Sequence, residues 1–434
     1  MKQTVNIFWF RRDLRLNDNH GLFKALNGKH SVLPVFIFDT EILDKLPKDD
    51  ARVSFIHKTL QNLNKTLQTK YSSSLAMYFG KPIEVYKQLT QDYNIYTVFT
   101  NHDYEPYAQT RDIEIKTFLA ENNIEFKTYK DQVVFEKNDI LKSDGTPYVV
   151  YTPYMKQWKA LFKTIKLQIY ETEALLSNTI KTKQLPNVSL AYMGFTISNQ
   201  QIEDFTVTPQ LIKNYEATRN FPSQDSTSKL GPHLRFGTVS IRRMVQKAVA
   251  EQNEIFWQEL IWREFFMHIL WHFPHTVTHS FKPKYDRIEW RNNEDEFRLW
   301  CEGQTGYPLV DAGIRQLNQT GFMHNRVRML VGSFLCKHLL IDWRWGEAYF
   351  AQKLHDYDMA SNIGNWQWVA GCGVDAAPYF RIFNPTTQIE KFDKNLEYIK
   401  QWCPDFQELT YPTPIVDHKM ARERCLQVYK KALH

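Results

Sequence analysis

The stretch DYDMASNIGNWQW, residues 356–368, places carboxylates, an amide and indoles within thirteen positions. Buried carboxylates need charged or hydrogen-bonding partners, and a buried indole needs an acceptor for its N–H group. A core helix with only a packing role rarely combines these groups so densely. We therefore interpret Asp356, Asp358, Asn362, Trp366 and Trp368 as candidates for a site where a polar ligand meets an aromatic wall.

A second candidate surface is the helical pattern ELIWREFF. Glu259, Trp262, Arg263 and Phe266 follow one another at i, i+3, i+4 and i+7, so they share one helix face. This spacing suits an ordinary helix with an ion pair and a core indole. It also suits a pocket wall that stacks a flat ligand and hydrogen-bonds to its edge.

Two further stretches combine charge with helix-start residues. In GFMHNRVRM, Asn325 and Met329 lie four positions apart, with Arg326 and Arg328 beside them. They form either a ligand surface or a solvated basic face around a core methionine. Residues 227–229 of DSTSKLGPHLRFG read as a helix start, where hydroxyl and free N–H groups favour a phosphate or simply cap the helix.

The elements before about residue 135 form one pattern. Short apolar runs such as VNIFWF, SVLPVFIF, IYTVFTN and KTYKDQVVF alternate with helical stretches. This alternation predicts βαβ units on a parallel, doubly wound, Rossmann-like sheet over residues 1–135. The motifs GxGxxG and GxxxxGK do not occur there, so a cofactor in this domain would be held in another way.

The rest of the chain has a different composition. The stretch from about 165 to 210 is polar and irregular, so we interpret 136–210 as an interdomain linker with some helix. Helical periodicity then dominates, as in EIFWQELIWREFFMHILWHF. Only Trp9 and Trp158 of the twelve tryptophans precede residue 256. These features predict a larger, all-α domain over 211–434.

Composition limits the classes of protein. The five cysteines are scattered and lack a C-x-x-C pair, so neither a disulfide framework nor a metal site is expected. No secretory signal and no membrane-spanning apolar run is present, so we expect a cytoplasmic protein without a membrane partner. The net charge of +6 is compatible with a nucleic-acid partner but does not require one.

In their order along the chain and in their residues, these segments resemble the photolyase and cryptochrome flavoproteins. The resemblance begins at WFRRDLRLNDNHGL and continues through ELIWREFF, TGYPLVDAGIRQLNQTGFMHNRVRM and LLIDWRWGEAYF to DYDMASNIGNWQW and DAAPYFRIFNPTTQ. It implies an N-terminal α/β domain that can hold a light-harvesting antenna. It also implies that the helical domain binds FAD, which acts in its reduced anionic form.

The resemblance carries a set of flavin-site residues onto this chain. They are Tyr215, Thr227, Ser228, Lys229, Leu230, Gly231, Phe256, Glu259, Arg263, Arg328, Asp356, Tyr357, Asp358 and Asn362. The family's phosphate-binding run reads T-S-R-L-S, and this chain has Lys229 and Gly231 in place of the arginine and the second serine. Backbone N–H donors survive both changes, although one hydroxyl contact is lost.

It also implies catalytic and DNA-binding roles. Asn362 faces the reactive flavin nitrogen. An electron relay leads outward from the flavin through Trp366, Trp343 and Trp290. Glu259 hydrogen-bonds to the lesion, which is flipped out of the duplex into the site. The implied DNA-binding residues are Arg219, Glu259, Trp262, Arg263, Phe266, Asn325, Arg326, Met329 and Trp368.

Departures from relatives narrow the expected activity. Photolyases for 6-4 lesions resemble one another in having histidines where this chain has Asn325 and Met329, and plant-type cryptochromes have Asp at the position of Asn362. Dash-type cryptochromes read closer to NRGRQ than to NRVRM, and no long tail precedes His434. We expect a monomer that repairs cyclobutane pyrimidine dimers in UV-damaged DNA. A blue-light photoreceptor is the alternative, whereas a non-catalytic flavoprotein would need broken pocket residues.

The antenna chromophore stays open. Folate-binding relatives resemble one another in a V-N-E segment where this chain reads Pro106, Tyr107 and Ala108, and in a lysine near Thr278. These departures count against methenyltetrahydrofolate. A deazaflavin, a second flavin or no antenna remain as alternatives.

Overall fold

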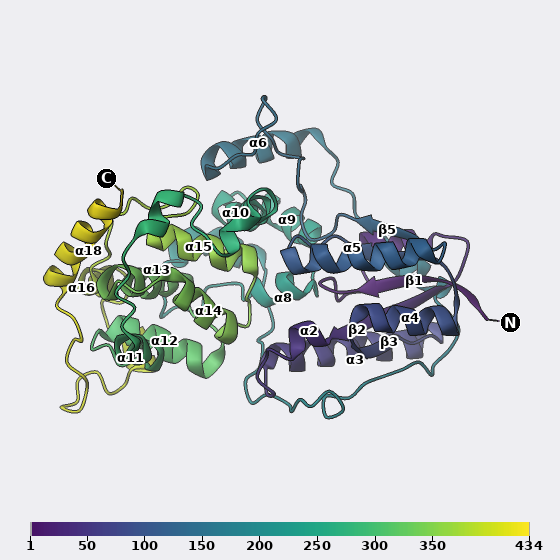
Figure 1. The fold of residues 1–434 in the computed structure, drawn as a ribbon, viewed down its shortest axis with the longest axis horizontal. Coiled ribbons are helices and arrows are strands. Elements are labelled where there is room, and N and C mark those ends of the chain that lie inside the picture. The colour runs from purple at the N-terminus through teal and green to yellow at the C-terminus, as the bar shows by residue number, and fades with distance from the viewer. Residues whose placement is uncertain (1, 434) are drawn as a thin grey trace. The chain divides into compact units, whose positions relative to one another are not determined.

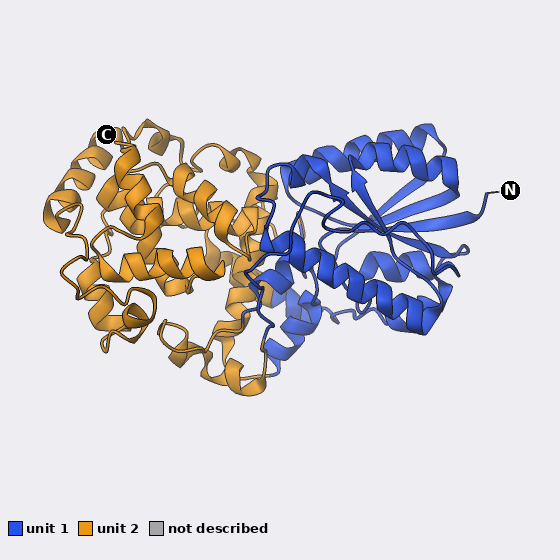
Figure 2. Ribbon diagram, turned by 90° about the horizontal axis from the view of Figure 1, so that it is seen from below, with its two compact units in different colours: residues 1–136, 160–205, 229–250 blue, residues 137–159, 206–228, 251–434 orange. Residues whose placement is uncertain are grey.

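The computed structural model describes residues 2–433, which fold into two compact units that interleave along the chain (Figure 2). The first unit consists of Met1–Glu136, Ala160–Phe205 and Lys229–Ala250. The second unit consists of Lys137–Lys159, Thr206–Ser228 and Glu251–His434. Each unit therefore contains segments that are distant in sequence.

The first unit is built on a five-stranded sheet in which every neighbouring pair is parallel (Figure 1). Its strands are β1 (Thr4–Phe10), β2 (Val32–Asp39), β3 (Ala76–Gly80), β4 (Asn94–Asn101) and β5 (Glu125–Tyr129), in the order β3-β2-β1-β4-β5. In the central strand, Ile7 pairs with Leu33 on one side and with Val98 on the other. The predicted doubly wound parallel sheet is confirmed.

Helices cover both faces of this sheet because its central strands are apolar on both sides. The helices are α1 (His20–Leu26), α2 (Thr40–Leu43), α3 (Ala51–Tyr71), α4 (Pro82–Asp92) and α5 (Pro106–Glu121). Leu22 of α1 and Leu60 of α3 share one apolar core with Phe8. Leu89 of α4 and Leu119 of α5 share another with the alternate side chains of β1.

A buried ionic network joins the ends of the first unit's segments. Asp131 pairs with Arg15 at 2.6 Å and with Arg242 at 2.8 Å. Arg242 also contacts Asp18 at 3.1 Å, and the Ser240 hydroxyl donates to the same carboxylate. Burial alone would raise the pKa of Asp131, but the two arginines hold it at about 2. Segment Lys229–Ala250, with α8 (Gly231–Phe236) and α9 (Ile241–Val249), is thus an integral part of this unit.

The described residues of the second unit contain helices and no β-strand, which confirms the predicted all-α class. The longer ones are α10 (Glu254–His272), α12 (Pro308–Thr320), α15 (Met359–Ala370) and α18 (His418–Leu433). The others are α6 (Tyr151–Thr164), α7 (Pro209–Thr218), α11 (Glu294–Glu302), α13 (Asn325–Ser333), α14 (Trp343–Lys353), α16 (Pro385–Phe392) and α17 (Glu397–Trp402). A short π-helix, Phe334–Leu339, continues α13.

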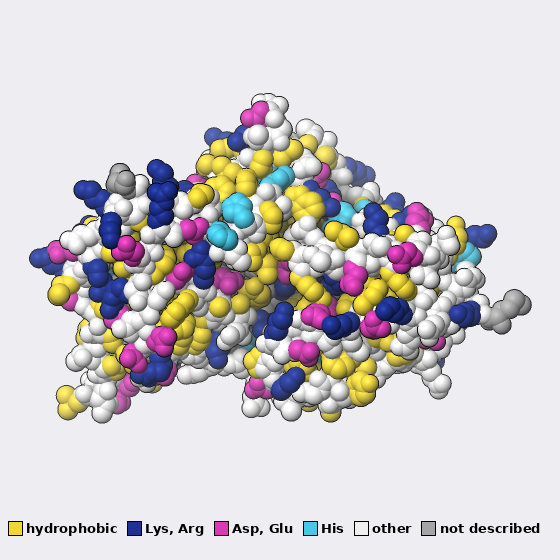
Figure 3. All heavy atoms as spheres, in the orientation of Figure 1, with side chains coloured by type: hydrophobic (Ala, Val, Ile, Leu, Met, Phe, Trp, Pro, Cys, Tyr) yellow, Lys and Arg dark blue, Asp and Glu magenta, His cyan; other side chains and the backbone are white. Residues whose placement is uncertain are grey.

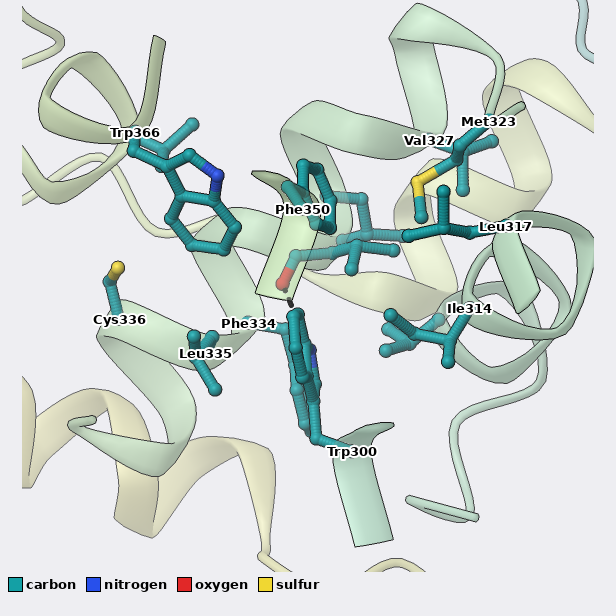
Figure 4. Close-up of a cluster of buried hydrophobic side chains, with 14 of the residues drawn as sticks. Trp300, Ile314, Leu317, Met323, Val327, Phe334, Leu335, Cys336, Phe350 and Trp366 are labelled. Atoms are coloured by element: carbon teal, nitrogen blue, oxygen red, sulfur yellow. Dashed lines mark hydrogen bonds between the residues drawn. The ribbon is translucent and has the colours of Figure 1, made fainter. Parts of the chain in front are cut away.

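The core of the second unit is a cluster of aliphatic and aromatic side chains that includes residues of α11, α12, α13, α14 and α15 (Figure 4). Trp300 is fully buried, lies nearly parallel to Phe350 at 6.3 Å between ring centroids, and meets the edge of Trp366 at the same distance. Asp358 begins α15 by accepting a hydrogen bond from the Ser361 N–H, and Gly371 ends it at a φ of 89°. The tryptophan-rich stretch is therefore one capped helix with a core-facing side.

Candidate functional site

The predicted face of α10 is assembled as the spacing indicates. Glu259 pairs with Arg219, whose Nη1 lies 2.5 Å from Oε1 of the glutamate. Trp262 is half-buried, and its ring lies 5.5 Å from that of Phe266. Burial lowers the pKa of Arg219, but the charge of Glu259 and that of Tyr215 raise it above its usual value. In this structure the ion pair with Arg219 thus holds the Glu259 carboxylate in one orientation.

Asn362 is fixed from one side by the neighbouring helix α14. Its Nδ2 donates to the side-chain Oε1 of Glu347 at 2.9 Å and to the backbone oxygen of Glu347 at 3.1 Å. Burial raises the pKa of Glu347, and the hydrogen bond from Asn362 opposes part of that rise. Glu347 thus engages the amide N–H side of Asn362, which leaves the amide oxygen as the group that would accept a hydrogen bond from a ligand.

Charged groups lie at the start of α15. Arg328 of α13 forms two hydrogen bonds to Asp356, at 3.1 and 2.9 Å, in the fork geometry that suits a carboxylate. Tyr357 separates Asp356 from Asp358, the N-cap of α15. α15 itself packs against α13, α14 and α10. The three helices therefore converge on the residues predicted for the flavin.

The other predicted flavin residues are divided between the units. Tyr215 of α7 meets Phe256 of α10 edge-on at 5.2 Å, and its pKa is raised to about 12 by burial and by Glu259. Thr227 and Ser228 belong to the second unit. There the backbone oxygen of Ser228 accepts a hydrogen bond from the Thr206 backbone N–H. Lys229, Leu230 and Gly231 belong to the first unit, and Lys229 adopts a left-handed φ of 53° there. The structure brings the α10, α13 and α15 residues together within one unit.

The predicted DNA-contacting residues of α13 lie at its first turn. Asn325 is exposed, and Met329 is half-buried one turn later. Arg326 lies over the ring of Phe392 at 4.4 Å, and its Nη1 is 3.8 Å from the sulfur of Met329. Burial and the nearby charges of Arg219 and Arg381 lower its pKa. Arg326, with the charge of Arg381 nearby, would bind an anion such as a phosphate, whereas Arg219 is already paired with Glu259.

The three predicted relay tryptophans differ in burial. Trp366 and Trp343 are 3% and 1% exposed, whereas Trp290 is half-buried. The indole N–H groups of Trp366 and Trp343 have no hydrogen-bond partner among the described residues. Trp290 meets Tyr429 edge-on at 6.0 Å between ring centroids. The inner two indoles are therefore dry, and the outer one reaches the surface.

Sequence reasoning missed three partners of these residues. Glu347, in the stretch RWGEAYF, orients Asn362. Trp300 contacts Trp366 in the core. Tyr151 stacks on Trp262, with ring centroids 3.5 Å apart and planes only 8° from parallel. None of the three contacts had a local signal, because each joins residues from two different helices.

The donor set fits a flavin dinucleotide. Asn362 offers an uncharged acceptor beside the buried aromatic cluster, and Arg328, Asp356 and Asp358 supply charged groups at the helix start. Within residues 2–433 no group of three or more His, Cys, Asp or Glu side chains gathers so as to hold a metal ion. Figure 3 shows basic and acidic side chains interspersed over the visible face, so the net positive charge forms no uniform patch there. None of the helices in the described part of the chain has the length and apolar character needed to cross a membrane.

Comparison with known proteins gives matches over the whole chain. Residues 6–174 match the family described as DNA photolyase, and residues 256–410 match the FAD binding domain of DNA photolyase. The deoxyribodipyrimidine photo-lyase of Agrobacterium fabrum is 36% identical over 480 aligned positions, which cover 99% of this chain and 98% of that protein.

Solved structures with the same fold are also similar in sequence. A bacterial class III photolyase from Agrobacterium tumefaciens has a TM-score of 0.88 at 34% identity, covering 100% of this chain and 98% of that one. An archaeal photolyase from Sulfolobus tokodaii, solved with two FAD molecules, has a TM-score of 0.84 at 34% identity, covering 99% and 100%.

Proposed function

This chain belongs to the DNA photolyase family, and we propose that the α10, α13 and α15 residues described above perform its light-driven splitting of cyclobutane pyrimidine dimers in DNA. The activity is that of a light-dependent lyase. The observation that supports these assignments best is the joining, within one unit, of an oriented amide at Asn362 and an ion-paired recognition carboxylate at Glu259.

FAD is the cofactor of the matched domain, and the residues present fit it. When bound and reduced, FAD supplies light-driven one-electron transfer to the dimer, which splits the cyclobutane ring and returns the electron without net redox change. Asn362 would contact the reactive edge of the ring system, because an amide beside an anionic flavin avoids the repulsion that a carboxylate would add. Glu347 holds that amide in place from behind.

The lesion would be recognised by the α10 and α13 surfaces. A dimer must leave the base stack before a buried cofactor can act on it, and damage weakens the pairing that resists this. Trp262 and Trp368, both half-buried, would stack against the extruded bases. Glu259 would accept hydrogen bonds from the base edges, with Arg219 maintaining its orientation. Met329 would pack beside the dimer.

The relay tryptophans would have a separate task. Trp366, Trp343 and Trp290 would carry an electron inward that reduces oxidised FAD toward its active form, and the repair step itself does not use them. Burial of the inner two excludes water from the path. Trp290 would exchange electrons with a donor in solution.

An antenna chromophore is a further part of the proposal. The Sulfolobus relative was solved with two FAD molecules. In this chain Tyr107, at the position that disfavours folate, donates a hydrogen bond to Asp39 at 2.6 Å in the first unit. We propose that any antenna here is a second flavin or a deazaflavin, which release by heat and an absorption spectrum would identify.

Irradiated oligonucleotides test the proposed lesion. Two duplexes of one sequence, one with a cyclobutane thymine dimer and one with a 6-4 product, are exposed to blue light with protein whose FAD is fully reduced. Chromatography should show loss of the cyclobutane dimer and an unchanged 6-4 product. Repair of the 6-4 product, or no dimer loss with reduced FAD, would contradict the assignment; the second result would favour a photoreceptor.

A further inference from the structure

Tyr151 is the first residue of α6 and is buried against the recognition helix α10. Its ring covers one face of the Trp262 indole, with centroids 3.5 Å apart and planes 8° from parallel. The ring also meets Phe265 edge-on at 5.8 Å. A fully face-to-face pair is less favourable than an offset pair, so other contacts must hold these rings together.

Two hydrogen bonds supply that constraint. The Tyr151 hydroxyl donates to the backbone oxygen of Gln258 at 2.8 Å, which ties the tyrosine to the turn of α10 that carries Glu259. The Tyr151 backbone N–H, one of the free donors in the first turn of α6, donates to Asp375 at 3.2 Å. Asp375 lies in the loop that leaves α15. Tyr151 is thus bound to α10, which carries Trp262, and to the loop that follows α15, the helix that carries Trp368.

The rest of α6 docks on α10 through different contacts. Tyr154 and Trp158 follow Tyr151 at i+3 and i+7, so the three share one face of the helix. The Tyr154 ring pairs with Phe265 and His268, and the Trp158 indole donates to Glu264 at 2.6 Å. Docking of α6 and support of Trp262 can therefore be separated by substitution.

We propose that Tyr151 is a positioning residue for lesion recognition, which holds the Trp262 indole in the orientation that stacks a flipped pyrimidine dimer. This rests on the proposed role of Trp262. Because Tyr151 occupies one face of the indole, the lesion stacks on the surface that remains. Tyr151, at the start of α6, is therefore part of the recognition site and forms its back wall.

Matched variants test this role. The FAD-replete full-length protein is titrated with dimer-containing and intact oligonucleotides of one sequence, and the ratio of the two Kd values is the preference. Tyr151→Leu should lower the preference several-fold, and Tyr151→Phe, which keeps the stacked ring, should restore most of it. Tyr154→Leu, which removes a ring from the same helix face without touching Trp262, should leave it unchanged. At saturating DNA, Tyr151→Leu should repair as many dimers per absorbed photon as the parent.

Trp262→Ala and Asp375→Ala complete the set. If Trp262→Ala lost the preference and Tyr151→Leu kept it in full, the role of Tyr151 would be overturned and the proposed pocket would stand. If Trp262→Ala kept the full preference, the proposed pocket would be overturned as well. Equal losses in Tyr151→Leu and Tyr154→Leu would show helix docking to be the cause and would also overturn the inference. If Tyr151→Leu does not fold, Asp375→Ala replaces it, because this change at an exposed residue removes only the hydrogen bond to the Tyr151 backbone N–H. A loss of preference smaller than that in Trp262→Ala supports the proposal, and an unchanged preference contradicts it.

Discussion

Gly346 of α14 lies directly against the indole of Trp366 on α15. A Cβ atom at residue 346 would stand 2.1 Å from Cη2 and 2.5 Å from Cζ3 of Trp366, and 2.6 Å from a methyl carbon of Leu335. All three distances are well inside van der Waals contact. The absence of a side chain at Gly346 therefore sets how closely α14 approaches α15, and with it the place of the Trp366 indole, the proposed first member of the relay.

The substitution Gly346→Ala is expected to destabilise the protein. Alanine is favoured over glycine in a helix by about 1 kcal/mol, but overpacking a core costs about 1–3 kcal/mol, so the net effect should be a loss. Gly332→Ala is the matched control, because its Cβ would lie 3.5 Å from the same indole and 3.2 Å from Val369. Thermal unfolding of both variants and the parent measures this loss. A Gly346→Ala variant as stable as the parent, or more stable, would contradict the tight contact.

Trp366 and Trp368 should separate two functions that lie two residues apart. Trp366 is buried in the core, so Trp366→Phe should abolish light-driven reduction of oxidised FAD, since phenylalanine is much harder to oxidise than an indole. With chemically reduced FAD the same variant should still repair dimers. Transient absorption measures the first property and dimer loss the second.

Trp368→Ala should show the opposite behaviour. It should keep photoreduction and lose dimer affinity, because stacking of a base on an aromatic ring is worth about 1–3 kcal/mol. If both tryptophan variants damaged both properties equally in folded, FAD-replete protein, the two indoles would have only a packing role.

Arg326→Ala should weaken DNA binding regardless of sequence. A phosphate contact releases counterions, so removing one should reduce the slope of log K against log salt by about 1. Arg298→Ala, which removes an exposed arginine paired with Glu302 on α11, is the control of equal charge change. Equal salt slopes for Arg326→Ala and the parent would remove Arg326 from the DNA surface.

His338 should make stability depend on pH. It is fully buried beside His418, and burial together with the charges of His418 and Arg424 lowers its pKa to about 3. Below about pH 6.5 His338 binds a proton in the unfolded chain but stays neutral in the folded chain, so protonation favours unfolding. The folded state is therefore destabilised progressively as the pH falls from about 6.5 toward 3, and this pH-dependent loss is absent above about 6.5.

Urea unfolding at a series of pH values between about 6.5 and about 4 measures this effect. The free energy of unfolding should fall less steeply with decreasing pH in His338→Gln than in the parent, by at most about 1.4 kcal/mol per pH unit. His275→Gln, at an exposed histidine, should retain the parent slope. Parallel curves for His338→Gln and the parent would show that folding does not lower the pKa of His338.

Much of the fold was predictable because local patterns carry it. The strands β1 and β2 are continuous apolar runs, and α10 and α15 repeat apolar residues at helical spacing. β3 was not anticipated, because AMYFG is only five residues long. Residues 151–164 lay within the expected linker, although Tyr151, Tyr154 and Trp158 have the spacing of a helix face. That spacing does not reveal which helix the face meets.

The candidate site was predictable only in part for the same reason. Spacing grouped the α10 residues, and the resemblance supplied roles for those on α13 and α15. The pairs Glu347 with Asn362 and Trp300 with Trp366 join residues 15 and 66 positions apart. Such contacts depend on how helices pack, and a single sequence contains no local signal for them.

The interleaved units have a consequence for synthesis on the ribosome. Asp18 and Asp131 are buried carboxylates whose shared partner, Arg242, is made more than a hundred residues after the later of them. Until Arg242 emerges, closing the nascent sheet around Asp18 would leave an acid without its arginine, which is costly in a dry interior. The first unit should therefore gain its full stability only when residue 250 has been translated. A shortened gene that stops at residue 136 should yield a chain prone to aggregation and proteolysis, even though it encodes every strand of the sheet.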